Sequence, residues 1–112
     1  MPKYNWKEIQ ANNLPQKNKI SAITIGRKRI LVTNAENYYA FGSKCPHAGG
    51  NLEFGSILNG CEIECPLHRY VFNFKTGKMP SGPGLFLETY PIKIENKIVY
   101  VGIPTFFSWL YK

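Results

Sequence analysis

The chain has 112 residues, 44% hydrophobic and 19% charged, which suits one apolar core and argues against a disordered segment. A catalytic barrel of about 250 residues does not fit this length, and no apolar run approaches the roughly 18 residues that span a membrane. Fourteen basic residues against seven acids, all Glu, give a net charge of +7. We therefore expect one domain over residues 1–112 and an acidic partner.

Strand-forming sequences dominate both ends of the chain. Runs rich in β-branched and aromatic residues are separated by short polar turns, and the last two flank Asn96-Lys97 as a hairpin would. We expect strands at 19–25, 30–33, 38–41, 91–95 and 98–101. Gly26–Arg29 is expected to be the turn between the first two strands. Trp6–Gln10 favours a single helical turn, and helical periodicity is faint elsewhere, so the pattern predicts an all-β fold.

The middle of the chain differs in composition. Eight of the ten glycines and four of the eight prolines lie between Gly42 and Gly84, together with all three cysteines and both histidines. Loops on a strand scaffold are a common place for a functional site. The apolar stretch 104–112 is expected to pack against the sheet. Because Gly26–Arg29 is a dense basic run without interleaved aromatics, we do not expect nucleic-acid binding.

Two short motifs carry the chemistry. Cys45-Pro-His47 and Cys65-Pro-Leu-His68 each offer one thiolate and one imidazole. A Cys₂His₂ zinc site is one interpretation, although zinc fingers usually pair Cys with Cys and then His with His. A Cys–His catalytic pair does not explain why the arrangement occurs twice. One of each donor in each loop suits a dinuclear centre, such as a [2Fe–2S] cluster with two His ligands on one iron.

These motifs resemble the cluster loops of Rieske-type [2Fe–2S] proteins. Segment 45–52 is similar to the first loop of that family and segment 65–68 to the second. The similarity extends to the strand and turn at 72–78, the proline-rich loop at 80–85 and the final hairpin at 90–101. The resemblance implies an all-β fold of three antiparallel sheets, with a loop-rich cluster-binding subdomain at about 43–84 and one [2Fe–2S] cluster per chain.

The resemblance also implies a ligand set. Cys45 and Cys65 would bind the inner iron, and His47 and His68 would bind the outer iron at an exposed tip. Lys44 and Arg69 are expected to flank that tip, where they would favour an acidic partner at low salt.

Three positions invite comment. Arg69 stands where the family usually has Gly, and Asn73 where Asp is frequent; we expect Arg69 to have ordinary backbone geometry. The third thiol, Cys61, would share one strand face with Ile63 and Cys65 and is interpreted as a small buried hydrophobe.

The functional expectation is a soluble, cytoplasmic, low-potential Rieske ferredoxin without catalytic residues. It would carry single electrons from a flavin-dependent reductase to a terminal oxygenase or reductase, with no membrane partner. The start of the chain lacks the apolar core of a signal peptide. One alternative is the small Rieske subunit of an NAD(P)H-dependent nitrite reductase, and another is a zinc-binding structural module.

The low potential is implied by what high-potential family members share. They join the two loops by a disulfide and donate Ser and Tyr hydroxyls to cluster sulfurs. Gly50 and Leu67 occupy the disulfide positions here, and Tyr70 and Phe72 occupy the hydroxyl positions. Gly50, Leu67 and Phe72 cannot supply these groups, and Tyr70 is too long to act as the Ser does.

Overall fold

The computed structural model describes residues 3–47, 49–67, 69–80 and 84–105. Within them lie strands and two short 3₁₀ helices: β1 (Tyr4–Ile9), η1 (Ala11–Asn13), β2 (Ile20–Ile25), β3 (Lys28–Ala35), β4 (Asn37–Gly42), η2 (Leu52–Phe54), β5 (Ser56–Leu58), β6 (Glu62–Glu64), β7 (Val71–Asn73), β8 (Thr89–Tyr90), β9 (Ile92–Glu95) and β10 (Ile98–Pro104). In this described part of the chain, no helix is long and apolar enough to cross a membrane.

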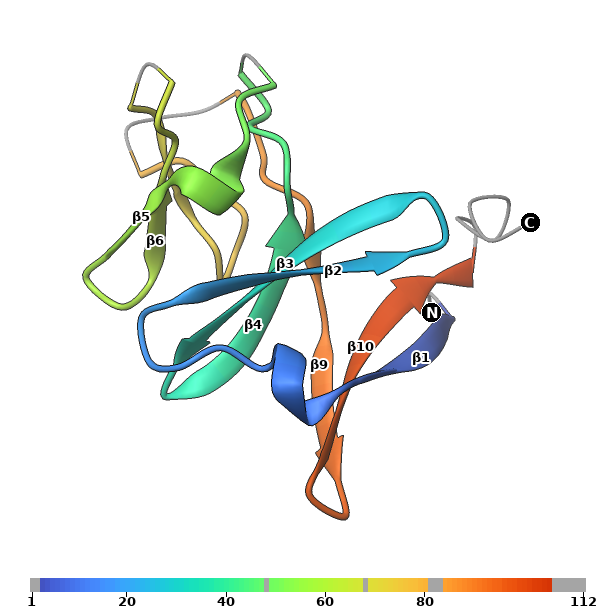
Figure 1. Cartoon of the computed structure of the whole chain (residues 1–112). Coiled ribbons are helices and arrows are strands. Elements are labelled where there is room, and N and C mark those ends of the chain that lie inside the picture. The colour runs from blue at the N-terminus through green and yellow to red at the C-terminus, as the bar shows by residue number, and fades with distance from the viewer. Residues whose placement is uncertain (1–2, 48, 68, 81–83, 106–112) are drawn as a thin grey trace.

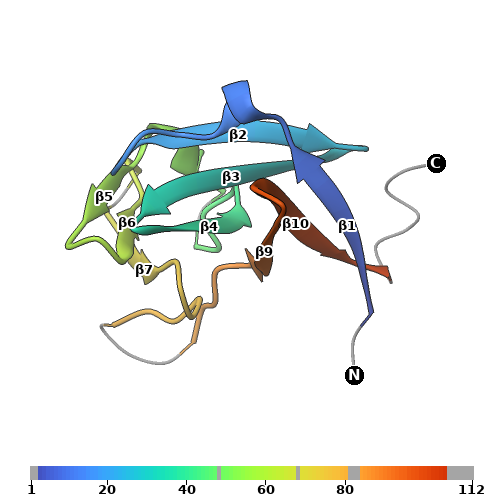
Figure 2. The same cartoon turned by 90° about the horizontal axis from the view of Figure 1, so that it is seen from below.

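The strands form three antiparallel sheets. Their orders are β1-β10-β9, β2-β3-β4-β8 and β5-β6-β7. Figure 2 shows the β2–β4 sheet between the β5–β7 sheet on one side and β1 with β10 on the other. The expected all-β fold of three antiparallel sheets is confirmed.

Strand β3 is buried on both faces, which explains its continuous apolar sequence. Ile30 and Val32 pack into a core shared with β10, whereas Leu31 packs into a second core beneath the β5–β7 sheet. A strand with only one buried face would alternate apolar and polar residues. Strand β3 therefore joins the scaffold to the part of the molecule that contains Cys45 and Cys65, both members of the second core.

The turn between β2 and β3 has the residue type that a short hairpin loop requires. The loop between β2 and β3 is only Gly26-Arg27, because Lys28 already pairs with Ile25, and Gly26 has a φ of 61°. Glycine at the first position is what a two-residue type II′ loop requires. The predicted turn at Gly26–Arg29 was thus too long by two residues.

The expected helical turn at Trp6–Gln10 is wrong. Residues 4–9 form β1, in which Trp6 lies opposite Gly102 of β10. A Cβ atom at Gly102 would lie 2.9 Å from a Trp6 ring carbon, so the indole occupies the space that a side chain would need. Pairing with a distant strand decides this segment, and local propensity does not reveal it. The predicted packing of 104–112 falls mostly outside the described residues.

Candidate metal centre

The first cysteine loop follows β4 and is closed by backbone hydrogen bonds. The Cys45 amide donates to the Gly50 carbonyl and the Gly49 amide donates to the Cys45 carbonyl, each at 2.8 Å. Lys44 and Asn51 form an isolated antiparallel bridge at the base of the loop. The loop is therefore a tight hairpin whose two sides are fixed to each other just below Cys45.

The second cysteine loop joins β6 to β7. The Cys65 amide donates to the Tyr70 carbonyl at 2.8 Å, which closes a loop of four residues. Arg69 reverses the chain there with a φ of 59°. The expectation of ordinary geometry at Arg69 is therefore wrong: this tight turn demands the left-handed region, where Gly is the usual residue and Arg costs about 1 kcal/mol.

The two loops bring their thiols together inside the apolar core. Cys45 is 2% exposed and Cys65 is fully buried. Burial raises the pKa of the Cys65 thiol, a hydrogen bond from the Leu67 amide opposes this, and the hydrogen bond and charge of Cys45 raise the pKa further. The surroundings of Cys65 thus disfavour its thiolate form. A metal pair would supply positive charge and deprotonate both thiols.

The histidines occupy different positions with respect to this pair. His47 is exposed, and its ring lies against the Tyr70 ring with centroids 3.9 Å apart and planes inclined by 31°. His68 lies outside the described residues. Among the described residues, His47 and the two thiols do not form a set of three that could hold one ion. The structure thus pairs the thiols in the core and places one imidazole at the surface.

Gly50 makes the contact between the two loops possible, a role that the sequence analysis missed. A Cβ atom there would lie 2.9 Å from the Cys65 Sγ atom and 3.1 Å from the Leu67 Cβ atom. The only clue in the sequence is the Gly49-Gly50 pair within a ligand motif. The short distance to the Leu67 Cβ atom places positions 50 and 67 side by side, as the resemblance to relatives with a disulfide at these positions requires.

Cys61 lies in neither of the two cysteine loops. It lies in the turn before β6, its amide donates to the Leu58 carbonyl, and its side chain is half-buried. The prediction of a buried position on the strand face is therefore wrong, because Gly60 (φ 68°) turns the chain just before Cys61 and β6 begins only at Glu62. Phe72 and Phe74 are buried, whereas Tyr70 is half-buried.

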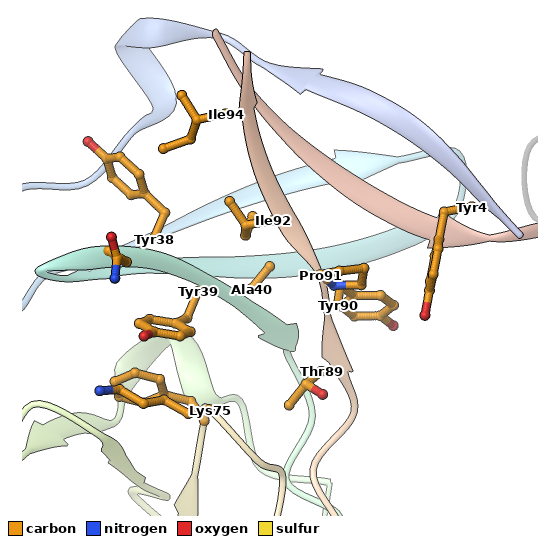
Figure 3. Close-up of a pocket in the computed structure, with 12 residues that line it drawn as sticks. Tyr4, Tyr38, Tyr39, Ala40, Lys75, Thr89, Tyr90, Pro91, Ile92 and Ile94 are labelled. Atoms are coloured by element: carbon orange, nitrogen blue, oxygen red, sulfur yellow. The ribbon is translucent and has the colours of Figure 1, made fainter. Parts of the chain in front are cut away.

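Two hollows in the part of the chain that the structure describes have no Cys among their lining residues. One of about 710 Å³ lies beside His47, Tyr70 and Met79. Another, of about 670 Å³, lies between β4 and β9, and tyrosines and isoleucines are among its lining residues (Figure 3). In that second hollow Lys75 lies over the Tyr39 ring, 5.2 Å from its centroid. Its lining residues include no Cys, His or Glu.

The donor set and its placement agree with the comparison against known families. The model of the Rieske [2Fe–2S] domain matches residues 5–91. The chain belongs to the Rieske [2Fe–2S] family. The cofactor of this Rieske protein is accordingly a [2Fe–2S] cluster, and the residues present fit it: two paired, buried thiols and an exposed imidazole are donors of the types that such a cluster takes.

Two curated relatives differ in how much of them the chain matches. Apoptosis-inducing factor 3 of Homo sapiens is 40% identical over 75 residues, which are 66% of this chain but only 12% of that protein. The ferredoxin component of the naphthalene 1,2-dioxygenase system of Pseudomonas putida is 33% identical over 100 residues, 88% of this chain and 95% of that protein.

Solved structures share the fold. A chain in the complex of reduced oxygenase and oxidized ferredoxin in carbazole 1,9a-dioxygenase matches with a TM-score of 0.73 and 28% identity, over 85% of this chain and 99% of that chain. A nitrite reductase small subunit from Mycobacterium tuberculosis matches with a TM-score of 0.74 at 15% identity, over 89% and 96%. The second likeness shows the fold alone.

Gly50→Ala is predicted to lower the iron and sulfide content of the Rieske protein. The added methyl group meets the Cys65 sulfur at 2.9 Å, so one loop must shift, with an overpacking penalty of about 1–3 kcal/mol. Gly49→Ala is the control, because its Cβ meets nothing within 4 Å and its φ of 72° adds strain alone. Iron per chain and thermal unfolding are measured for both. Full iron content in Gly50→Ala would show that the loops do not depend on this contact.

Proposed function

We propose that this Rieske protein is a cytoplasmic one-electron carrier, which accepts electrons from a flavin-dependent reductase and delivers them to a terminal oxygenase or reductase. The observation that carries the proposal is the match to 95% of the dioxygenase-system ferredoxin component, a protein of almost the same extent. The exposed position of His47 beside buried thiols supports it, because an electron can then leave through the ligand nearest to the surface.

The proposed ligand set assigns Cys45 and Cys65 to the inner iron and His47 and His68 to the outer iron. The paired thiols support the first assignment, since their burial excludes water from the inner iron. The bound cluster supplies a site that gains and loses one electron. The Tyr70 ring fixes one side of the His47 imidazole and so helps to hold its plane.

The two alternative functions have less support. The likeness to a nitrite reductase small subunit is one of fold at 15% identity, and this likeness does not favour the same role. A zinc-binding module shares the Cys₂His₂ donor set, but the matching family is defined by a [2Fe–2S] cluster.

Cys45→Ser and Cys65→Ser are predicted to abolish stable cluster incorporation, because the inner iron then lacks a soft anionic ligand. Cys61→Ala is the matched control: it also removes one thiol, but from a turn outside the thiol pair. Visible absorbance and acid-labile sulfide per chain are the measurements. Loss of the cluster in Cys61→Ala, or its retention in Cys65→Ser, would contradict the ligand assignment.

The midpoint potential is predicted to lie near the negative end of the Rieske range, which spans about −150 to +300 mV. Two ferric ions, two sulfides and two thiolates sum to zero charge, which keeps the potential above that of four-thiolate clusters. Further raising groups are missing: Phe72 is buried without a hydroxyl, and Gly50 beside Leu67 cannot form a disulfide.

Protein-film voltammetry is the measurement. A reversible one-electron couple at the negative end supports the carrier. A midpoint well inside the positive range would contradict the low-potential assignment and the ferredoxin role with it.

A further inference from the structure

Basic side chains gather on one side of the first cysteine loop. Arg27, Lys28, Arg29 and Lys44 line a depression of about 220 Å³ together with Ser43 and Glu88. The β2–β3 hairpin brings its three cations to this place because Ile30 pairs with Gly42, at the point where β4 leads into the loop. We call the four cations the basic face. Lys44 immediately precedes Cys45 and is exposed, so the basic face adjoins the metal centre.

Ion pairs fix two of the four cations. The Lys28 Nζ atom lies 2.8 Å from the Glu88 Oε1 atom, and the Arg29 Nη2 atom lies 2.7 Å from the Glu53 Oε1 atom. The second pair ties β3 to η2, directly after the cysteine loop. These pairs hold the hairpin against the loop. Their two Glu carboxylates also offset part of the positive charge of Lys28 and Arg29.

The other two cations leave the basic face with a surplus of charge. Arg27 and Lys44 are exposed and form no ion pair with an acid among the described residues. Both side chains are therefore available to a partner, and neither needs to break an existing pair before it binds an acid.

The hollow beside His47 lacks this surplus among its described lining residues. Arg69 lines the hollow beside His47, but Glu62 lines the same hollow and offsets its charge. The sequence suggested a symmetric arrangement, with Lys44 and Arg69 on either side of the tip. In the folded chain the hairpin adds three cations to the Lys44 side alone, so the electrostatic attraction is one-sided.

We infer that the basic face is the docking surface for an acidic patch on the protein redox partner. The inference rests on the proposed carrier function and adds the place and the charge of the contact. Charge complementarity steers association and sets the register of two proteins. A partner held at Arg27 and Lys44 is anchored beside the loop that bears Cys45 and His47, close to where the electron leaves.

The test compares two charge reversals of equal size. Arg27→Glu changes the turn residue of the β2–β3 hairpin, and Lys97→Glu changes the turn residue of the β9–β10 hairpin, at the end of the molecule away from the cysteine loops (Figure 1). Both residues are exposed, and both variants lower the net charge by the same amount. Lys44→Glu is a second variant within the basic face.

The probe is flavodoxin, an acidic flavoprotein, in its fully reduced form. One electron leaves the reduced flavin and enters the oxidised centre of the loaded protein, and stopped-flow absorbance gives the second-order rate constant. The reaction is measured at about 10 mM and about 100 mM ionic strength, because this increase shortens the screening length from about 30 to about 10 Å. Unchanged visible spectra of the variants establish that the centre is intact.

Arg27→Glu and Lys44→Glu are expected to slow the reaction about tenfold at low ionic strength, with most of the difference lost at high ionic strength. Lys97→Glu should change it far less. Binding of oxidised flavodoxin should also shift the backbone amide resonances of residues 27–29 in the wild-type protein, a readout that needs no electron transfer.

Equal effects of Arg27→Glu and Lys97→Glu would overturn the docking surface, since total charge alone would then set the rate. Amide shifts at residues 27–29 caused by inorganic phosphate, and not by flavodoxin at the same ionic strength, would overturn it as well. In either case a wild-type protein that still takes up one electron leaves the carrier function standing. A wild-type centre that no donor reduces would contradict the carrier function itself.

Discussion

Two thiols held side by side in an apolar core are the constraint on which the rest of the structure depends. Cys45 lies in the loop between β4 and η2 and Cys65 in the loop between β6 and β7, and each loop is closed by its own backbone hydrogen bonds. Burial and the neighbouring Cys45 thiol both raise the pKa of Cys65. Metal charge beside the sulfurs would favour their thiolate forms. The fold thus provides a site that a cationic centre completes.

The remaining architecture keeps that pair in place. Strand β3 packs one face into the core that it shares with β10 and the other face into the core around the cysteines. Gly50 has no side chain that would push the two loops apart. The Arg29–Glu53 ion pair joins the β2–β3 hairpin to the segment after the first loop, so the same contact that stiffens the loop also positions the basic face.

Much of this could be predicted from the sequence, and the failures have physical causes. The β2–β3 and β9–β10 hairpins follow from alternation and turn residues, and the two ligand motifs follow from donor types and spacing. The prediction of a helical turn at Trp6 failed because its strand is defined by pairing with Gly102, nearly a hundred residues away. The prediction of ordinary backbone geometry at Arg69 failed because the four-residue loop requires a left-handed backbone conformation there, whatever the side chain. The basic face could not be foreseen, since it is assembled from the tip of one hairpin and the base of a loop.

The most direct test of the account is electron paramagnetic resonance of the dithionite-reduced protein, combined with ¹⁵N labelling of its histidines. A [2Fe–2S] centre held by Cys45, Cys65, His47 and His68 should give a single unpaired spin per chain, with hyperfine coupling to two histidine nitrogens that changes on labelling. A diamagnetic protein that contains zinc, or a spin signal without histidine coupling, would contradict the proposed centre.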